Sequence, residues 1–173
     1  MHRRFSHRTA QFFFITCLLC TGILLSACGY KLAADTPSIL GDGTKTLKIK
    51  EVSNPTLEAW LPASVRSGLR DAINARHLAV WVDQGPADYE IKIDIKGYTS
   101  RETMSSRTDV ALLYDNRLAI NATIYDGATN KVIWQSGEIS YADRSEDRGR
   151  EDSADDLISQ IMSRLTEKLR NTF

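Results

Sequence analysis

The sequence predicts an α+β domain in which a mostly antiparallel sheet of roughly four strands carries two helices packed on one face. Apolar residues recur at every second position in the ranges 45–52, 89–96 and 117–145, which is typical of strands. They recur at helical spacing in the ranges 54–78 and 157–169. Because both helices must bury an apolar stripe, they are expected to share the one apolar face of the sheet.

The first strand is expected at 45–52, where Leu47 and Ile49 alternate with lysines. In the helix that follows, apolar residues fall four apart and form one stripe: Leu57, Leu61, Val65, Leu69 and Ile73. Pro62 interrupts the early part of this helix. It is expected either to kink the helix or to mark its first turn, since proline cannot donate the hydrogen bond that an interior turn needs.

Residues 78–82 are a second candidate for extended structure, and 89–96 form the most regular alternation in the chain. The polar segment 100–116 is expected to be a long connection. Two further strands are expected within 117–145, joined by a tight hairpin turn at 126–130.

The C-terminal helix is expected after a charged, turn-like segment at 145–156. Ser153 and Asp156 resemble a capping box, and acidic side chains suit the positive end of a helix. The apolar residues that follow are spaced as one stripe: Leu157, Ile158, Ile161, Met162, Leu165 and Leu169.

Residues 1–27 have the layout of a secretory signal peptide. Three arginines precede a run of 17 apolar or small residues at 12–28. A permanent membrane helix usually needs about 20 apolar residues. The run ends in Leu25-Ser26-Ala27-Cys28, which looks like a bacterial lipobox: an aliphatic residue, two small residues and a cysteine.

Cys28 is therefore expected to be lipidated, its thiol taking a diacylglycerol group and its freed amine a third chain. Two acyl chains already anchor a protein stably. Gly29 follows where Asp would retain a lipoprotein in the inner membrane, so the outer membrane of a Gram-negative bacterium is the expected location. Cys17 and Cys20 would leave with the signal peptide, which disfavours a metal or redox role for their C-x-x-C spacing.

The expected domain organisation is a signal peptide at 1–27, a lipidated N-terminus and tether at 28–44, and a single α+β domain at 45–173. Removing 1–27 removes three of the 22 basic residues and no acidic residue, which leaves a net charge of about −3. That charge does not favour a nucleic-acid partner.

Motifs of enzymes are missing from the chain. It has no phosphate-binding glycine loop and no G-x-S-x-G motif. His77 is the one histidine after Cys28, and no cysteine lies near it to form a catalytic pair or a metal site. We therefore expect a protein that is not an enzyme, without cofactor or metal.

Basic residues in two expected connections are candidates for phosphate binding, because arginine matches phosphate through a bidentate fork. Arg101 and Arg107 lie before the hairpin, and Arg148 and Arg150 lie before the last helix. Strand lysines 48, 50, 92 and 96 could also face a phosphorylated lipid, but they equally fit ordinary solubility and edge protection.

Several of these stretches together resemble the LptE family of lipoproteins. The resemblance rests on "LLSACGYKL" at 24–32, "NPTLEAWL" at 54–61, "LAINATIYDGATNKVIW" at 118–134 and the order of the elements. It covers nearly the whole chain after Cys28.

The resemblance implies a fold of two helices on a four-stranded sheet and a role in lipopolysaccharide transport. Members of the family sit as a plug in the lumen of the LptD β-barrel, help to assemble it and bind lipopolysaccharide. The family's basic residues lie before the third strand and near the start of the last helix. Arg107 matches the first place, and Arg150 or Arg148 approximates the second.

The alternative function is an outer-membrane lipoprotein that acts as an adaptor for a peptidoglycan synthase or another envelope complex. Such an adaptor needs a long tether to reach across the periplasm. The expected tether has only about 15 residues and extends at most roughly 50 Å. This length favours a partner close to the membrane.

Overall fold

The computed structural model divides the chain into two compact units, Met1–Asp35 and Thr36–Phe173. It describes residues 38–105, 111–146 and 150–171, all of which belong to the second unit. Residues 28–37 of the expected tether, with Cys28, lie outside the described residues. The last part of that segment, from Ser38 onward, is described below.

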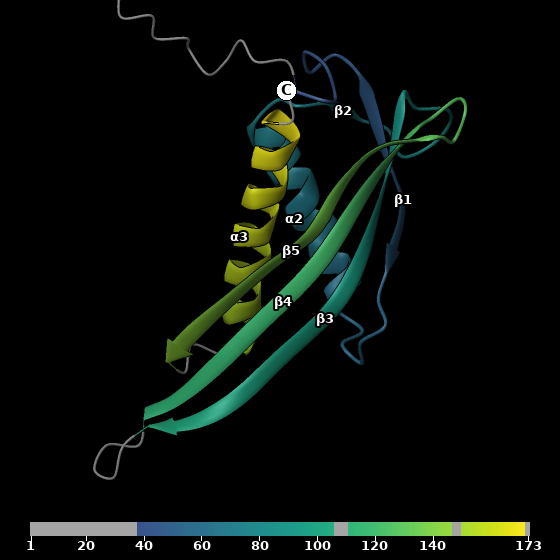
Figure 1. Cartoon of the computed structure of the whole chain (residues 1–173). Coiled ribbons are helices and arrows are strands. Elements are labelled where there is room, and N and C mark those ends of the chain that lie inside the picture. Colours follow the sequence, from purple (N-terminus) through teal and green to yellow (C-terminus); the bar gives the residue numbers. More distant parts are fainter. Residues whose placement is uncertain (1–37, 106–110, 147–149, 172–173) are drawn as a thin grey trace, which may run out of the picture. The chain divides into compact units, whose positions relative to one another are not determined.

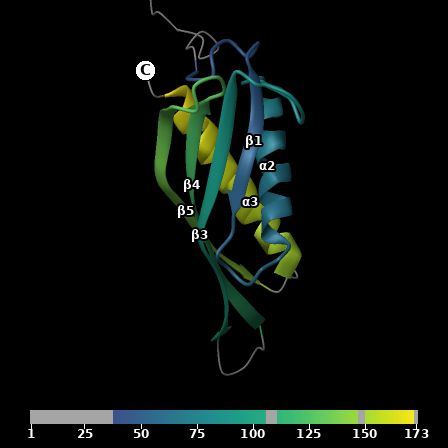
Figure 2. The same cartoon turned by 90° about the vertical axis from the view of Figure 1, so that its right-hand side faces the viewer.

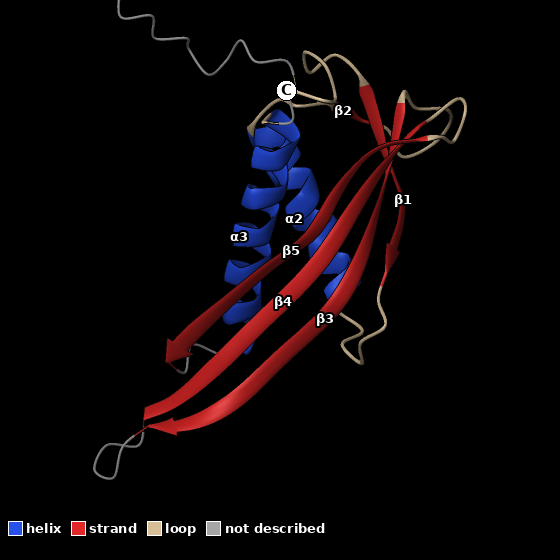
Figure 3. Cartoon of the chain, viewed as in Figure 1, coloured by secondary structure: helices blue, strands red, loops and turns tan. Residues whose placement is uncertain are grey.

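The second unit is a sheet with both helices on one of its faces (Figures 1 and 3). Figure 2 looks onto the sheet, with α3 passing behind the strands. The elements follow in the order β1 (Thr46–Ser53), α2 (Leu61–Ala75), β2 (Val80–Trp81), β3 (Tyr89–Ser105), β4 (Ala111–Asp126), β5 (Val132–Glu146) and α3 (Arg150–Arg170). The predicted α+β class is confirmed.

The sheet is mixed, with the strand order β2-β1-β3-β4-β5. β1 runs parallel to both of its neighbours, whereas the long pairings of β3 with β4 and of β4 with β5 are antiparallel. The strand beyond the expected four is β2, two residues long, and it falls within the predicted extended segment 78–82. A helix must intervene between parallel neighbours, and α2 fills that role between β1 and β2.

The core lies between the sheet and the helices. Alternation puts one set of side chains from each strand on the helix side, and the register aligns these sets across the sheet. Ile91 of β3 pairs with Ile124 of β4, and Ile93 pairs with Ala122; all four residues are buried. The stripes of both helices close over them, with Leu69 of α2 and other apolar side chains fully buried.

α2 begins one turn later than its apolar stripe predicts. Pro62 occupies the first turn, so the second of the two predictions for it is confirmed. Leu57 was expected in the stripe, and this is wrong: it lies before the helix with a relative exposure of 101%. The cause is local, because Asn54 Oδ1 accepts hydrogen bonds from the backbone N and the Oγ1 of Thr56 at 3.0 and 2.7 Å. These bonds hold the chain in a turn instead of a helix.

α2 ends in a Schellman motif. The amide of Leu78 donates to the carbonyl of Ile73 at 3.1 Å, and the amide of His77 donates to the carbonyl of Asn74 at 3.1 Å. His77 takes the left-handed conformation that this motif requires, with φ of 50°. The histidine thus serves in a helix end where glycine is the usual residue.

β3 and β4 are much longer than the alternation predicts. The expected connection at 100–116 is wrong over most of its length, since β3 runs to Ser105 and β4 starts at Ala111. Figure 1 shows this hairpin extending past the ends of the helices. Where no helix covers the strands, neither face needs apolar residues, so the period-two signal disappears although the strands continue.

α3 starts at Arg150, so the expected capping box of Ser153 and Asp156 is wrong. The segment 145–152 is charged and has no apolar periodicity, which is why the sequence pattern places the helix start too late. The predicted stripe of α3 itself is buried as expected.

The short segment before β1 packs onto the domain. Leu40 is fully buried in the core, and the amide of Ile39 donates to the carbonyl of Leu169, near the end of α3, at 3.1 Å. The chain therefore enters the domain beside the C-terminal end of α3.

Candidate functional site

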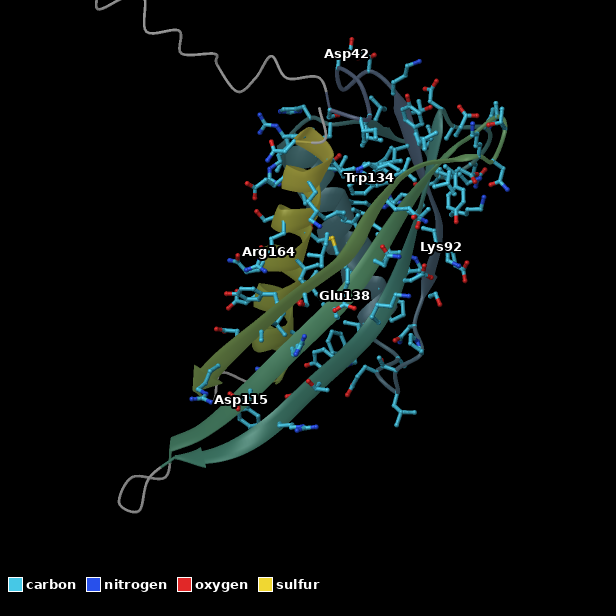
Figure 4. All side chains as sticks on the ribbon, in the orientation of Figure 1. Asp42, Lys92, Asp115, Trp134, Glu138 and Arg164 are labelled. Atoms are coloured by element: carbon cyan, nitrogen blue, oxygen red, sulfur yellow. The ribbon has the colours of Figure 1, made fainter. Side chains whose placement is uncertain are left out.

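The helices leave the opposite face of the sheet uncovered, and we call it the open face. Lys92, Glu138 and Asp115, labelled in Figure 4, follow one another along the sheet toward the distal end of the β3–β4 hairpin. The open face has two parts with different electrostatics. The proximal part lies near the β4–β5 turn, and the distal part lies toward the far end of the β3–β4 hairpin.

Charges on the proximal part are paired across the strands. The Nζ of Lys50 lies 2.9 Å from Glu90 Oε2, and the Nζ of Lys92 lies 3.1 Å from Glu51 Oε2 and 3.4 Å from Asp94 Oδ1. Glu51, and next Asp94, raise the pKa of Lys92 above its ordinary value. These lysines are engaged within the sheet, which favours the solubility interpretation over a lipid-facing patch.

The distal part contains an open hollow of about 650 Å³, which we call the arginine groove. Its lining comes from β3, β4 and β5 and includes three arginines. The lining residues are Thr99, Arg101, Asp115, Asn116, Arg117, Ala142, Asp143 and Arg144. The three arginines come from three adjacent strands, and the pairing of β3 with β4 and of β4 with β5 brings them together.

The strand register arranges the groove in two rows across the open face. In one row Arg101 pairs with Asp115, which pairs with Arg144 on its other side. In the next row Arg117 lies between Thr99 and Ala142. Asp143 and Asn116 form a pair between these rows, so strand alternation directs their side chains to the other face.

Asp115 is the carboxylate that balances part of this charge. Arg144 donates from Nε to Asp115 Oδ1 at 2.7 Å and from Nη2 to Oδ2 at 3.3 Å, which is a two-point ion pair. Asp115 raises the pKa of the Arg144 guanidinium above its ordinary value. The side chains of Arg144 and Asp115 are 63% and 45% exposed, so solvent screens the pair and it holds Arg144 only weakly.

Arg101 and Arg117 are not neutralised in the same way. Both side chains are exposed, and neither forms a hydrogen bond or ion pair within the part of the chain that the structure describes. Two free guanidinium groups beside a weakly paired third give the distal part a local excess of positive charge. Such a surface attracts anions, phosphate above all.

Of the four predicted phosphate-binding residues, two belong to described elements. Arg101 lies in the arginine groove on β3. Arg107, in the interval between β3 and β4, and Arg148, between β5 and α3, are outside the described residues. Arg150 is the first residue of α3. Of these four candidates, only Arg101 is a residue whose side-chain surroundings are described, and it lines the arginine groove.

Sequence reasoning missed Arg117 and Arg144. Arg117 precedes an alternating strand and was counted as its boundary, and Arg144 was assigned to the polar end of the last strand. The available signal was the alternation itself, because Arg117 shares a face with Asn121 and Thr123. Recognising the site also required the register of β3, β4 and β5, which cannot be predicted from the pattern of a single strand.

A second hollow, of about 700 Å³, lies between α2 and α3. Most of its lining is small or hydroxyl-bearing: Ser64, Ser67, Gly68, Ala72, Ala75, Ser159 and Ser163. Arg76, also in the lining, donates to the backbone carbonyl of Ser163 at 3.0 Å and to its Oγ at 3.1 Å. These contacts tie the helices together, and the other charged residues of the lining are Asp71 and Asp155.

No cluster of three metal-ligating side chains suited to a metal ion occurs in the described ranges. Neither described helix is long and apolar enough to cross a bilayer.

Comparison with known proteins identifies a family for nearly the whole described region. The family model LptE, described as lipopolysaccharide-assembly, matches residues 44–171. No curated protein matches the chain.

Solved structures share the fold at low sequence identity. An uncharacterised lipoprotein B from Nitrosomonas europaea is 14% identical, with a TM-score of 0.50, over 83% of this chain and 92% of that one. A protein from Xanthomonas campestris is 14% identical, with a TM-score of 0.50, over 78% and 87% of the two chains. A hypothetical protein from Chlamydia trachomatis is 11% identical, with a TM-score of 0.50, over 75% and 99%. At these identities the likeness concerns the fold alone.

Proposed function

Because the chain belongs to the lipopolysaccharide-assembly family LptE, we propose that it acts as the plug and assembly partner of an LptD-like β-barrel in the outer membrane. In this role it is a non-catalytic lipoprotein, held at the membrane by acyl chains on Cys28. Its folded domain lies in the periplasm or in the lumen of the barrel.

The observation that carries this proposal is the open face. No helix covers this face, and its proximal part is a set of matched charges such as Lys50 with Glu90, as is usual for a sheet face that meets water. Large apolar side chains that are exposed within the described residues are few: Leu57, Val80, Val132 and Ile133. A barrel lumen is polar and wet, and a plug with such a surface suits it.

The position of the anchor also supports a partner close to the membrane. Nine residues, 29–37, separate Cys28 from Ser38, the first described residue, and the ten steps along the chain between them span at most about 35 Å. A Cys28→Ser variant should lose incorporation of radiolabelled palmitate and should no longer sediment with outer-membrane fragments. Unchanged labelling of that variant would rule out Cys28 as the anchor.

The test of partnership is affinity purification of the tagged chain from detergent-solubilised outer membranes, followed by mass spectrometry. We expect one large β-barrel protein to co-purify in a constant ratio. Depletion of the chain should then leave that barrel misfolded and the outer membrane permeable. Recovery of a peptidoglycan synthase in place of a barrel, or normal barrel levels after depletion, would contradict the proposal.

We further propose that the chain contacts lipopolysaccharide directly through arginines, namely Arg107 with Arg101, Arg148 and Arg150. Replacing Arg107 with Glu should weaken binding of purified lipopolysaccharide with little loss of thermal stability. The control is Arg66→Glu on the exposed surface of α2. Equal binding by the wild type and the Arg107 variant would remove Arg107 from the site.

A further inference from the structure

We propose that Arg164 and Lys168 of α3 block the outer edge of β5 against pairing with a further strand, and that the strand they exclude is β5 of a second copy of this chain. Among the described strands β5 is the last in the order of the sheet, and β4 pairs with one of its two edges. A free edge presents backbone amides and carbonyls to which another strand can bind. This inference concerns the isolated chain and does not depend on the partnership with a barrel.

Two cations of α3 occupy backbone acceptors of β5. Arg164 Nη1 donates to the carbonyl of Ser140 at 2.9 Å, and Lys168 Nζ donates to the carbonyl of Ser136 at 2.8 Å. The guanidinium of Arg164 also lies over the ring of Tyr141, 4.8 Å from its centre, which holds the side chain in place. Arg164 and Lys168 are exposed residues, so the carbonyls that they reach lie on the edge of β5 that faces away from β4.

The docking of α3 does not require these two contacts. The apolar stripe of the helix is buried, with Leu165 and Leu169 both at 0% exposure, and burial of such side chains supplies most of the free energy that holds a helix on a sheet. Interactions of exposed charged side chains add little by comparison. Their larger effect is on β5, because a carbonyl that accepts from a cation and lies under its side chain is screened from the amide of an incoming strand.

The outer edge of β5 has properties that favour the addition of a strand. β5 is 15 residues long, and Val132 and Ile133 at its start remain 44% and 37% exposed. The opposite edge of the sheet offers less, because β2 has only two residues and Arg70 of α2 lies 5.5 Å from the centre of the Trp81 ring. A basic side chain from a helix therefore covers each edge.

The sequence of β5 fits a second copy of itself. Two identical edges can pair antiparallel about a twofold axis. With the axis at Tyr141, Ser140 lies opposite Ala142 of the other copy, and the blocked carbonyl of Ser140 is then next to the axis. Glu138 lies opposite Arg144 in both halves of this pairing. Opposite charges on facing strands favour a pair, so the register is complementary in charge.

The experiment measures the association state of the acylated chain, purified without other proteins in excess non-ionic detergent, by sedimentation at several protein concentrations. The test variant combines Arg164→Met and Lys168→Met, which keep long side chains and remove their donors. The matched control combines Arg66→Met and Lys96→Met, which remove one arginine and one lysine from exposed positions elsewhere. Arg164→Lys with Lys168→Arg keeps both donors. Thermal unfolding monitors the fold of every variant.

A cysteine in place of Tyr141 tests the pairing register. Because the backbone groups of Ser140 and Ala142 face the outer edge, those of Tyr141 face β4, and the two copies of residue 141 form a non-hydrogen-bonded pair. Their Cα atoms would lie about 4.5 Å apart, within the range that a disulfide spans. With Cys28 acylated, Tyr141→Cys in the test variant should give an intermolecular disulfide on oxidation by copper phenanthroline. Tyr141→Cys alone should not.

We expect the wild type, the matched control and the donor-preserving variant to be monomeric. The test variant should dimerise, with a dissociation constant at least roughly tenfold below that of the wild type. Should the test variant fail to fold, Arg164→Met and Lys168→Met are measured singly, and each is expected to shift the equilibrium in the same direction by a smaller factor.

Four results would overturn the proposal. A folded test variant that stays monomeric would show that the edge needs no protection, and dimerisation of the matched control to the same degree would assign the effect to net charge. Single variants that lose thermal stability without associating would restrict both cations to docking α3. A dimer that does not cross-link through position 141, or a wild-type background that cross-links equally well, would contradict the blocked pairing of β5 with β5.

Discussion

His77 has a backbone conformation that is unfavourable for a residue with a Cβ, and the hydrogen bonds at the end of α2 offset its cost in free energy. It holds a left-handed conformation, with φ of 50°, in the Schellman motif that ends α2. For a residue with a Cβ this conformation costs roughly 1–2 kcal/mol, whereas glycine adopts it freely. We therefore predict that His77→Gly stabilises the domain by about 0.5–1 kcal/mol, measured by urea unfolding. His77→Ala is the control, because it removes the imidazole and keeps the Cβ; a gain in that variant too would assign the effect to the imidazole.

Leu57 and Leu61 are neighbours in the same predicted stripe, yet they differ completely in burial. Leu57 is fully exposed and Leu61 has a relative exposure of 0%. We predict that Leu57→Ser changes the free energy of unfolding by less than about 0.5 kcal/mol. Leu61→Ala should cost about 2–5 kcal/mol, because it leaves a cavity in the core. Comparable losses in both variants would mean that Leu57 is buried in solution.

Individual residues also show where sequence reasoning stops. The apolar alternation of β3 and β4 predicts which residues face the core, and Ile91 and Ile124 are buried as expected. Arg101 was recognised as a candidate because arginine suits phosphate. Its neighbours Arg117 and Arg144 were not, because residues 101 and 144 meet only through the register of three strands, and register depends on the whole sheet.

At the scale of elements, the β4–β5 turn packs tightly against the loop that precedes β3. A Cβ on Gly127 would lie 1.8 Å from the carbonyl oxygen of Ala87, and the amide of Gly127 donates to the carbonyl of Asp88 at 2.8 Å. We predict that Gly127→Ala costs about 1–3 kcal/mol, because the backbone must shift to admit the methyl group.

Gly97 provides the matched control for this prediction. It lies within β3, and a Cβ there would meet no heavy atom within 4 Å. Gly97→Ala should therefore be neutral or stabilise the strand by up to about 1 kcal/mol. Thermal unfolding measures both effects. Equal destabilisation by Gly127→Ala and Gly97→Ala would mean that the turn does not pack closely against residues 87–88.

The elements that the sequence predicted well are those with one buried face. α2, α3 and the proximal parts of β3 and β4 carry an apolar period because half of each is in the core. The distal parts of β3 and β4 carry none, since no helix lies over them, and they were taken for a connection. β2 forms only two residue pairs with β1, Thr46 with Val80 and Leu47 with Trp81. So short an edge strand leaves no periodic signal of its own.

For the whole molecule, carboxylates whose pKa values are lowered in the folded state contribute to the response to acid. The backbone amide of Thr46, and next its Oγ1, donate hydrogen bonds to the Asp88 carboxylate and hold its pKa below the ordinary value of 3.8. Thr129 and Arg70 have the same effect on the pKa values of Asp126 and Asp83. A carboxylate with a lower pKa in the folded state stabilises the fold above its unfolded value, and that contribution is lost as the pH falls through the folded value.

We therefore predict that stability is level with respect to these groups above about pH 4 and declines below it. Asp88→Asn should unfold more easily at pH 6 and show a smaller further loss between pH 4 and pH 2 than the wild type. Urea midpoints recorded over this range test the prediction. An acid-induced loss of the same size in both proteins would mean that Asp88 does not contribute.

The position of β1 in the sheet has a consequence for the time course of assembly. β1 precedes every other described strand in the chain, but it lies between β2 and β3, and both of its partners are made later. The β3–β5 meander joins neighbours in sequence and can form from short-range contacts, whereas β1 must wait for pairings that are distant along the chain. β1 is therefore expected to become fixed last. In the proposed role, the chain can reach the barrel while its first strand is still free, and docking can then coincide with the completion of its own sheet.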